Sequence, residues 1–180
     1  MRSKVVLVSM VALLAFASGC GIVNNLSASV PVAPSIAFRA ISPTQEHSAH
    51  FYEVPAQNAV FRTQSDVDSF LTKIANDQAE RLGMSSSETL PEIDFSTEQG
   101  ILVLFGAQAH GGYGGKIAAV EELPDRLIVH PVRELPSNQG IYAQMVVYPY
   151  HYVAIPRTEK PIDFASTVDR SKPGPWWFIF

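Results

Sequence analysis

The fold is decided by residues 101–120, ILVLFGAQAHGGYGGKIAAV, in which two apolar runs are joined by a glycine-rich loop. The first run, residues 101–105, contains only large or β-branched apolar side chains and lies between Gly100 and Gly106. Such a short run bounded by glycines is typical of a strand rather than a helix. The pattern therefore predicts a strand, a loop and a second strand.

The loop itself is unusually rich in glycine. Five of the eleven glycines of the chain fall between positions 106 and 115. Glycine is used where the backbone needs a positive φ or where another group must come close to it. The loop is therefore either a tight structural corner or a surface against which a partner docks, and the sequence leaves both open.

Nucleotide binding by this loop is excluded by the spacing of its residues. A phosphate-binding P-loop ending at Lys116 needs glycine where His110 stands and a hydroxyl where Ile117 stands. A dinucleotide fingerprint starting at Gly112 also fails at Ile117, and a strand rather than a helix is expected to follow.

Composition predicts one folded domain without affinity for nucleic acid. Of the 180 residues, 47% are apolar and 17% charged, and thirteen prolines separate short apolar runs, which favours β structure. The net charge of −4 argues against a nucleic-acid partner. We therefore expect a mostly β (α+β) domain over residues 36–180, an antiparallel sheet or sandwich with one packed amphipathic helix.

Residues 1–19 have the pattern of an export signal. Two positive charges, on Arg2 and Lys4, precede an apolar stretch that is too short to span a bilayer comfortably. Ala17-Ser18-Gly19-Cys20 resembles the bacterial lipobox, and Cys20 is the only cysteine of the chain. We expect Cys20 to be acylated and to hold the protein in membrane lipid, with residues 20–35 as a tether; an ordinary secretory signal is the alternative. The residue after Cys20 is Gly21 and not Asp, which by resemblance to Gram-negative lipoproteins suggests sorting to the outer membrane.

Residues 65–83 are expected to form the amphipathic helix. Ser65 and Asp68 have the spacing of a capping box, and Gly83 is suited to ending the helix. The apolar side chains between them fall mainly on one face, so that face should pack against a sheet.

Further strands are predicted on both sides of these elements. Short edge strands are expected within residues 36–41 and 51–62, and longer strands at 126–132, 141–148 and 151–155. Residues 176–180, WWFIF, are expected to form a last strand or to cover a sheet edge.

The second half of the chain, from about Leu90 to Phe164, resembles the PrcB C-terminal domain family. The likeness rests on a Pro-x-x-Asp-Phe approach at residues 91–95, the strand ending at Gly106, and two tyrosine motifs, Gly111-Gly112-Tyr113 and Tyr148-Pro149-Tyr150. The family's turn commonly has Pro-Thr before the glycines, whereas this chain has Ala109-His110. PrcB is the lipoprotein subunit of a bacterial surface protease complex, so the resemblance implies an exported protease as partner. The loop also resembles, more remotely, that of chagasin-type protease inhibitors.

The sequence offers few candidate residues for an enzyme active site, and we expect no cofactor. Apart from Cys20 there is no thiol, and no G-x-S-x-G elbow is present. His110, His130 and His151 could meet as a zinc site, although they lack a ligand motif. His47 and His50 lack a nearby third ligand, and the carboxylates Asp94, Glu121 and Glu122 are more typical of exposed turns.

The sequence therefore predicts a non-enzymatic binding protein. Tyrosine is favoured at interfaces because its ring buries a large area and its hydroxyl can form a hydrogen bond. The alternative is that these tyrosines pack at the edge of the core. The candidate binding residues are His110, Gly111, Gly112, Tyr113, Tyr148 and Tyr150. We expect an accessory protein of the bacterial cell envelope that stabilises or regulates an exported protease; the alternatives are a structural envelope lipoprotein without a protease link and a histidine-based metal-binding protein.

Overall fold

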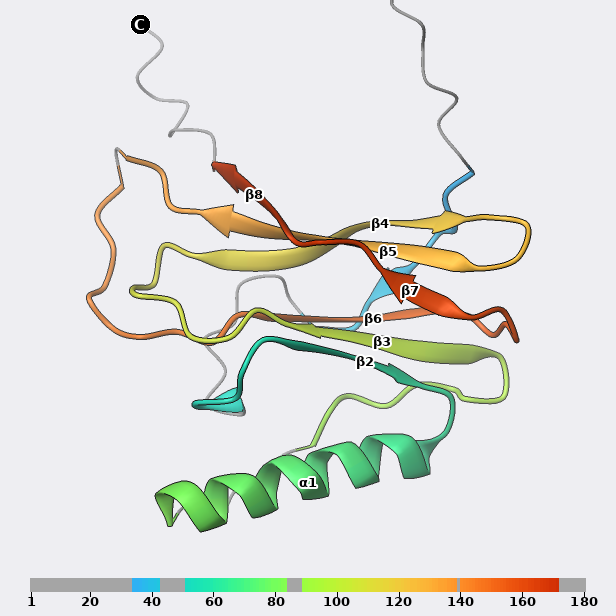
Figure 1. The fold of residues 1–180 in the computed structure, drawn as a ribbon, viewed down its shortest axis with the longest axis horizontal. Helices are drawn as coiled ribbons and strands as arrows, with labels where there is room; N and C mark the ends of the chain where they lie inside the picture. The colour runs from blue at the N-terminus through green and yellow to red at the C-terminus, as the bar shows by residue number, and fades with distance from the viewer. Residues whose placement is uncertain (1–33, 43–50, 84–88, 139, 172–180) are drawn as a thin grey trace, which may run out of the picture. The chain divides into compact units, whose positions relative to one another are not determined.

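The computed structural model describes residues 34–42, 51–83, 89–138 and 140–171. They form two β-sheets and one α-helix, stacked in three layers (Figure 1). This confirms the expected mostly β, sandwich-like fold with one packed helix. The expected signal peptide, Cys20, His47, His50 and the apolar segment 176–180 lie outside the described residues.

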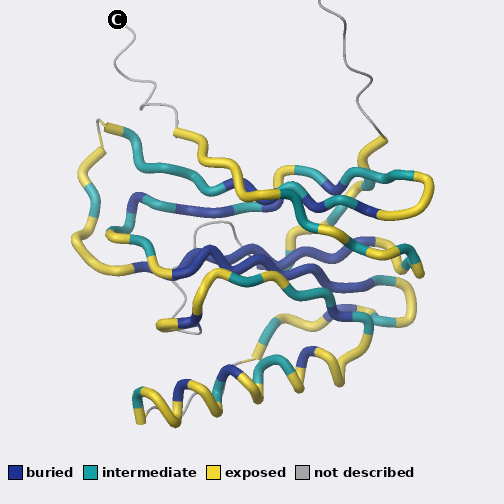
Figure 2. Tube along the Cα trace, viewed as in Figure 1, coloured by how far each residue is buried: buried dark blue, intermediate teal, exposed yellow. Residues whose placement is uncertain are grey.

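The middle layer is an antiparallel sheet in the order β1-β6-β3-β2. Its strands are β1 (Arg39–Ala40), β6 (Tyr150–Pro156), β3 (Glu98–Leu104) and β2 (Gln57–Phe61). The expected edge strands, β1 and β2, do lie at the two edges. Most of β3 is buried, because the second sheet covers one of its faces and the helix covers the other (Figure 2).

The outer sheet contains β4 (Gly114–Glu122), β5 (Leu127–Leu135), β7 (Ile162–Phe164) and β8 (Val168–Ser171). The strands β4 and β5 are antiparallel, but β7 and β8 both run parallel to β5. The outer sheet is therefore mixed: β4 and β5 form the antiparallel pair, and the edge formed by β7 and β8 is parallel. The chain reaches β7 by a crossover through the middle sheet, which allows a parallel approach.

Pro131 explains why two short strands, rather than one long strand, line the outer side of β5. Pro131 pairs with Ile117 of β4, and the N–H of Ile117 points away from β5, to His151. In an antiparallel pair of this kind the backbone N–H groups of both residues point away from each other, so the nitrogen of Pro131, which carries no hydrogen, faces the side of β5 opposite β4. There β7 pairs with Leu127–Val129 and β8 with Val132–Leu135, so the strand pairing is interrupted at Pro131.

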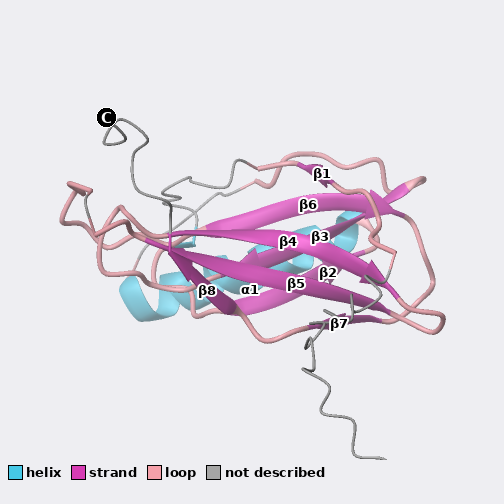
Figure 3. Ribbon diagram, turned by 90° about the horizontal axis from the view of Figure 1, so that it is seen from above, coloured by secondary structure: helices cyan, strands magenta, loops and turns pink. Residues whose placement is uncertain are grey.

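The third layer is helix α1 (Gln64–Leu82), which runs beneath the strands when the molecule is seen from above (Figure 3). It begins after Thr63, whose side chain accepts from the backbone N–H of Asp66, while the Asp66 carboxylate accepts from the N–H of Thr63. The capping box thus lies two residues before the one predicted at Ser65. Gly83 ends the helix with φ 65°, as expected.

Two apolar cores hold the three layers together. Alternate residues of β3 face opposite sides: Ile101 and Val103 lie between the sheets, and Leu102 and Leu104 lie on the helix side. No helix among the described residues is long and apolar enough to cross a membrane.

The chain enters the sandwich at one end and has two connected loops at the other. At the first end, residues 34–36 pair with Val120–Glu122, at the close of β4. At the opposite end lie residues 105–113 and 136–149, here called the loop end (Figure 1). Residues 141–148, predicted as a strand, form no strand there; only Val147 pairs, with Gln108.

Candidate binding surface at the loop end

The glycines of the loop are used mainly to let aromatic rings approach the backbone. Among them Gly106 has a positive φ, 69°, whereas Gly112 and Gly115 do not. A Cβ on Gly112 would lie 2.7 Å from the ring of Tyr142 and from Pro136, and one on Gly115 would overlap the ring of Phe105. These contacts favour the structural-corner interpretation of the glycine-rich sequence.

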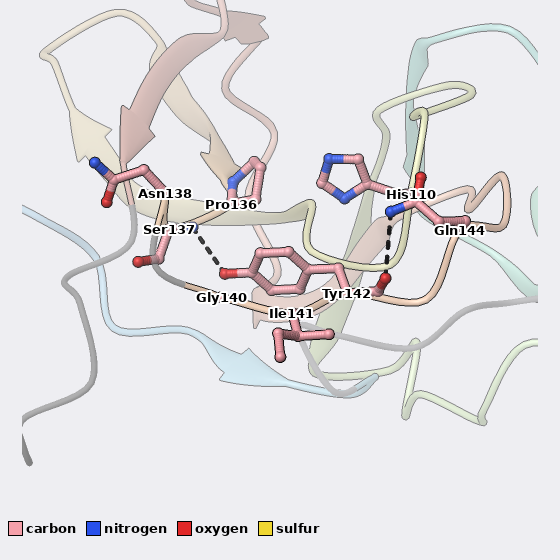
Figure 4. A pocket seen from close by; sticks show the side chains of 8 residues that line it. All are labelled: His110, Pro136, Ser137, Asn138, Gly140, Ile141, Tyr142 and Gln144. Carbon is pink, nitrogen blue, oxygen red and sulfur yellow. Dashed lines mark hydrogen bonds between the residues drawn. The ribbon is translucent and has the colours of Figure 1, made fainter.

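Tyr142 is the centre of the loop end (Figure 4). Its ring lies against both Gly112 and Gly140, where an added Cβ would clash with it. Its hydroxyl accepts a hydrogen bond from the N–H of Ser137 at 2.8 Å, and the ring of His110 stacks on it at 5.5 Å with an interplanar angle of 19°. Tyr142 is therefore held on several sides and fixes the path of the residues around it.

Backbone hydrogen bonds tie the two halves of the loop end together. Gln108 and Val147 exchange two hydrogen bonds, of 2.8 and 3.0 Å, and Gly111 donates to the carbonyl of Ala143 at 3.0 Å. Within the glycine loop, the N–H of Gly112 donates to Nδ1 of His110 at 3.3 Å. The loop end is thus a connected unit rather than two independent loops.

This connected unit exposes three apolar side chains to solvent. Ile141 is fully exposed, with a relative accessibility of 103%, and Met145 and Val146 are 51% and 52% exposed. Sequence reasoning missed them as surface residues because residues 141–148 form an apolar run of strand-like length. The flanking Gly140 and Pro149 are signals for a loop as well as for the ends of a strand.

Two open pockets lie at the loop end. One, of about 500 Å³, is lined by residues of both loops, among them His110, Asn138 and Tyr142 (Figure 4). The other, of about 630 Å³, has apolar walls that include Phe105, Val146 and Tyr148 and also includes Arg81 and Arg133. Arg133 is held by two hydrogen bonds of 2.9 Å to Asp169 on β8.

The predicted binding residues fall into two groups. His110, Gly111, Gly112 and Tyr113 are brought together at the loop end, where the half-buried ring of Tyr113 lies 4.9 Å from that of His110. Tyr148 and Tyr150 are only 8% and 5% exposed. They pack against Tyr52 and Phe51, with ring centroids 5.2 and 5.0 Å apart, and burial raises the pKa of Tyr148. These two tyrosines are core residues, and a docking role does not fit their burial.

The three histidines of the zinc hypothesis have separate environments. His151 is buried between the sheets and accepts the N–H of Ile117 at Nδ1, 2.9 Å away. Burial, with a smaller effect of Lys116, lowers the pKa of His151 from 6.5 to about 4. His130 bonds to Glu121 at 2.8 Å, and His110 stacks on Tyr142. No group of three or more metal-ligating side chains is found in the part of the chain that the structure describes.

The candidate carboxylates also have local structural partners. Asp94 accepts hydrogen bonds from Ser96 and Thr97 in a turn, which lowers its pKa. Glu122 accepts from the ammonium group of Lys160 at 2.8 Å.

Comparison of the chain with protein-family models, with curated proteins and with solved structures finds no match.

Proposed function

We propose that this chain is a lipid-anchored, non-enzymatic protein of the bacterial cell envelope that binds an exported protease through its loop end. The observation that carries the proposal is the exposure of Ile141, Met145 and Val146 on one short, well-braced segment. The lipobox at Cys20 and the resemblance to the PrcB C-terminal domain family supply the envelope location and the class of partner.

Two properties of the exposed side chains suit a binding role: the apolar area that they could bury, and the hydrogen bonds that hold their backbone in place. Full burial of one such side chain contributes about 1.5–3 kcal/mol. The hydrogen bonds from Gln108 and Gly111 hold the segment in place before a partner arrives, which reduces the entropy lost on binding. Three exposed apolar side chains within six consecutive residues are available for contact with a partner.

The position of the anchor is compatible with this role. The chain joins the sandwich at residues 34–36, beside the end of β4 and opposite the loop end. A random-coil chain of the length proposed for the tether, about fifteen residues, would span roughly 20 Å. Acyl chains on Cys20 would therefore hold the domain by one end and leave the loop end accessible.

A pull-down from detergent-solubilised envelopes tests the partner. The wild-type protein should retain a protease, and Ile141→Asp should lose it, since a charge would be buried in the interface. Ala118→Asp, which adds the same charge at an exposed position of β4, is the matched control and should retain the protease. Equal capture by both variants would contradict a loop-end interface. A wild-type eluate without a protease would favour the structural-lipoprotein alternative.

Lipidation is tested separately with Cys20→Ser. The variant should move from the membrane to the soluble fraction, because two or more acyl chains are needed for stable attachment. It should also stop incorporating labelled fatty acid. Unchanged partitioning of the variant would contradict the anchor.

A further inference from the structure

The segment that carries the exposed side chains of Ile141, Met145 and Val146 belongs to the loop that the chain enters on leaving β5. In the pairing of β5 with β8, Leu135 is opposite Ser171, the last residue of β8. The chain continues from Leu135 directly into Pro136 and the loop end (Figure 1). Residues that follow Ser171 therefore start beside Leu135, where the loop that carries the exposed apolar side chains begins.

The sequence after Ser171 is strongly apolar. Residues 172–180 read KPGPWWFIF, with Lys172 as the single charged side chain and five large apolar side chains in succession at the end. Nine residues reach at most about 30 Å when fully extended. Pro173, Gly174 and Pro175 are residues that redirect a chain, and they stand between β8 and the apolar segment.

We propose that residues 176–180 bind to the loop end of their own molecule and cover Ile141, Met145 and Val146. The larger pocket beside Val146 has exposed apolar walls from Pro55, Ala56 and Ala107, and its volume of about 630 Å³ has room for aromatic side chains. Because the segment belongs to the same chain, its effective concentration at the loop end is in the millimolar range expected for short linkers. Even a weak contact is therefore well populated.

This contact has a regulatory consequence, which rests on the proposed function. Residues 176–180 and the partner would compete for the same side chains, so the free protein would keep its binding surface covered. Removal of residues 172–180 should then strengthen capture of the partner several-fold.

The contact itself is measured without any partner, because Trp176 and Trp177 are the only two tryptophans of the chain. In the Cys20→Ser protein without lipid, their emission should be blue-shifted and several-fold less quenched by iodide than that of N-acetyltryptophanamide. Val146→Asp should restore quenching, whereas Ala118→Asp should not. Far-UV circular dichroism establishes that both variants are folded.

Two results would overturn the proposal. Quenching equal to that of the free indole would show that residues 176–180 are not covered. Protection that survives Val146→Asp, or that arises only after vesicles of phosphatidylethanolamine and phosphatidylglycerol are added, would place the tryptophans elsewhere or in a membrane.

A second measurement uses Met145 and needs no substitution in the loop end. Oxidation of Met145 by hydrogen peroxide follows its exposure, so deletion of residues 172–180 should accelerate it several-fold. An unchanged rate would contradict the contact even if the protease pull-down succeeds, so this inference and the proposed function can fail independently.

Discussion

The side chain of Tyr142 fills the space that a side chain at Gly112 or Gly140 would need. A similar relation joins Gly115 to Phe105 and Gly100 to Tyr152. Each of these glycines faces an aromatic ring, and for Gly100, Gly112 and Gly115 the ring belongs to another segment of the chain. At these positions glycine is required by the volume of a neighbour, and the density of glycine around position 112 follows from the way the rings pack.

Gly112→Ala should destabilise the protein by about 1–3 kcal/mol, the usual cost of an extra methyl group in a filled space. The added Cβ would lie 2.7 Å from the ring of Tyr142. Urea unfolding measures the change. In a double-mutant cycle with Tyr142→Ala, the cost should fall, since the ring is then absent; additive losses would mean that the ring is not the obstacle.

Gln99→Met should raise the free energy of unfolding by about 1–2 kcal/mol. Gln99 is 0% exposed and neither of its side-chain polar atoms has a hydrogen-bond partner among the described residues, so the amide costs desolvation without compensation. Gln78 is the matched control: it is 5% exposed, but its Nε2 donates to the carbonyl of Tyr52 at 2.8 Å. Thermal unfolding should show stabilisation by Gln99→Met and destabilisation by Gln78→Met.

Among the elements, α1 offers the sharpest test of how a helix start is specified. Thr63→Ala should cost about 1 kcal/mol, because it removes the acceptor for the N–H of Asp66. Ser65→Ala should change stability little, since Ser65 is an exposed residue within the first turn. Chemical denaturation gives the free energy of unfolding of each variant. A larger decrease for Ser65→Ala than for Thr63→Ala would mean that the N-cap is Ser65.

The sequence contains two overlapping capping patterns here, which is why the start of α1 was misplaced. Thr63 to Asp66 and Ser65 to Asp68 have the same spacing, and only the geometry shows which pair is used. The body of the helix and Gly83 were predictable because a long apolar stripe and a left-handed C-cap are both local signals.

A strand could be predicted from an apolar run where the strand is buried on both faces. The same kind of run gave a wrong prediction where the chain forms an apolar loop. Residues 101–105 form most of β3 because both of its faces are covered, so the local pattern and the tertiary setting agree. Residues 141–148 have a similar composition, but their path is set by the packing of the Tyr142 ring on Gly112. That contact joins segments about thirty residues apart, so the local sequence does not reveal it. β8 was missed because its four residues are all exposed and carry no apolar pattern. The exposed surface at Ile141 was missed for the same reason: exposure depends on what the rest of the molecule leaves uncovered.

At the scale of the whole molecule, His151 links the two sheets. It lies on β6 and accepts a hydrogen bond from Ile117 on β4, at the position where β4 has its register shift. Because the site is buried, with a smaller effect of the nearby Lys116, the pKa of His151 falls from 6.5 to about 4.

Stability should therefore decrease as the pH falls from 6.5 to about 4. In that window the unfolded chain binds a proton that the native state excludes, so up to about 3 kcal/mol is lost, at 1.36 kcal/mol per pKa unit. Below pH 4 both states are protonated at His151. Asp66, Asp94 and Asp169, whose pKa values lie below 3.8, add their losses only in that lower range.

Urea unfolding between pH 4 and 7 measures this dependence, with His151→Gln as the comparison. Gln can accept the N–H of Ile117 but does not titrate, so its stability should vary less over the window. An equally steep profile in the variant would assign the dependence to other groups.

The interruption at Pro131 has a consequence for the behaviour of many copies together. An unpaired strand edge is a template on which another molecule can add a strand, and the risk grows with the length of straight edge. Here the outer sheet ends in pieces of three and four residues, β7 and β8, while residues 34–36 cover the far end of β4. On the β7 and β8 side this sheet therefore offers no long uninterrupted ladder, and on the other side β4 has its register shift between Ile117 and Ala119. Copies that meet edge to edge on the β7 and β8 side would find no continuous backbone row along which to polymerise.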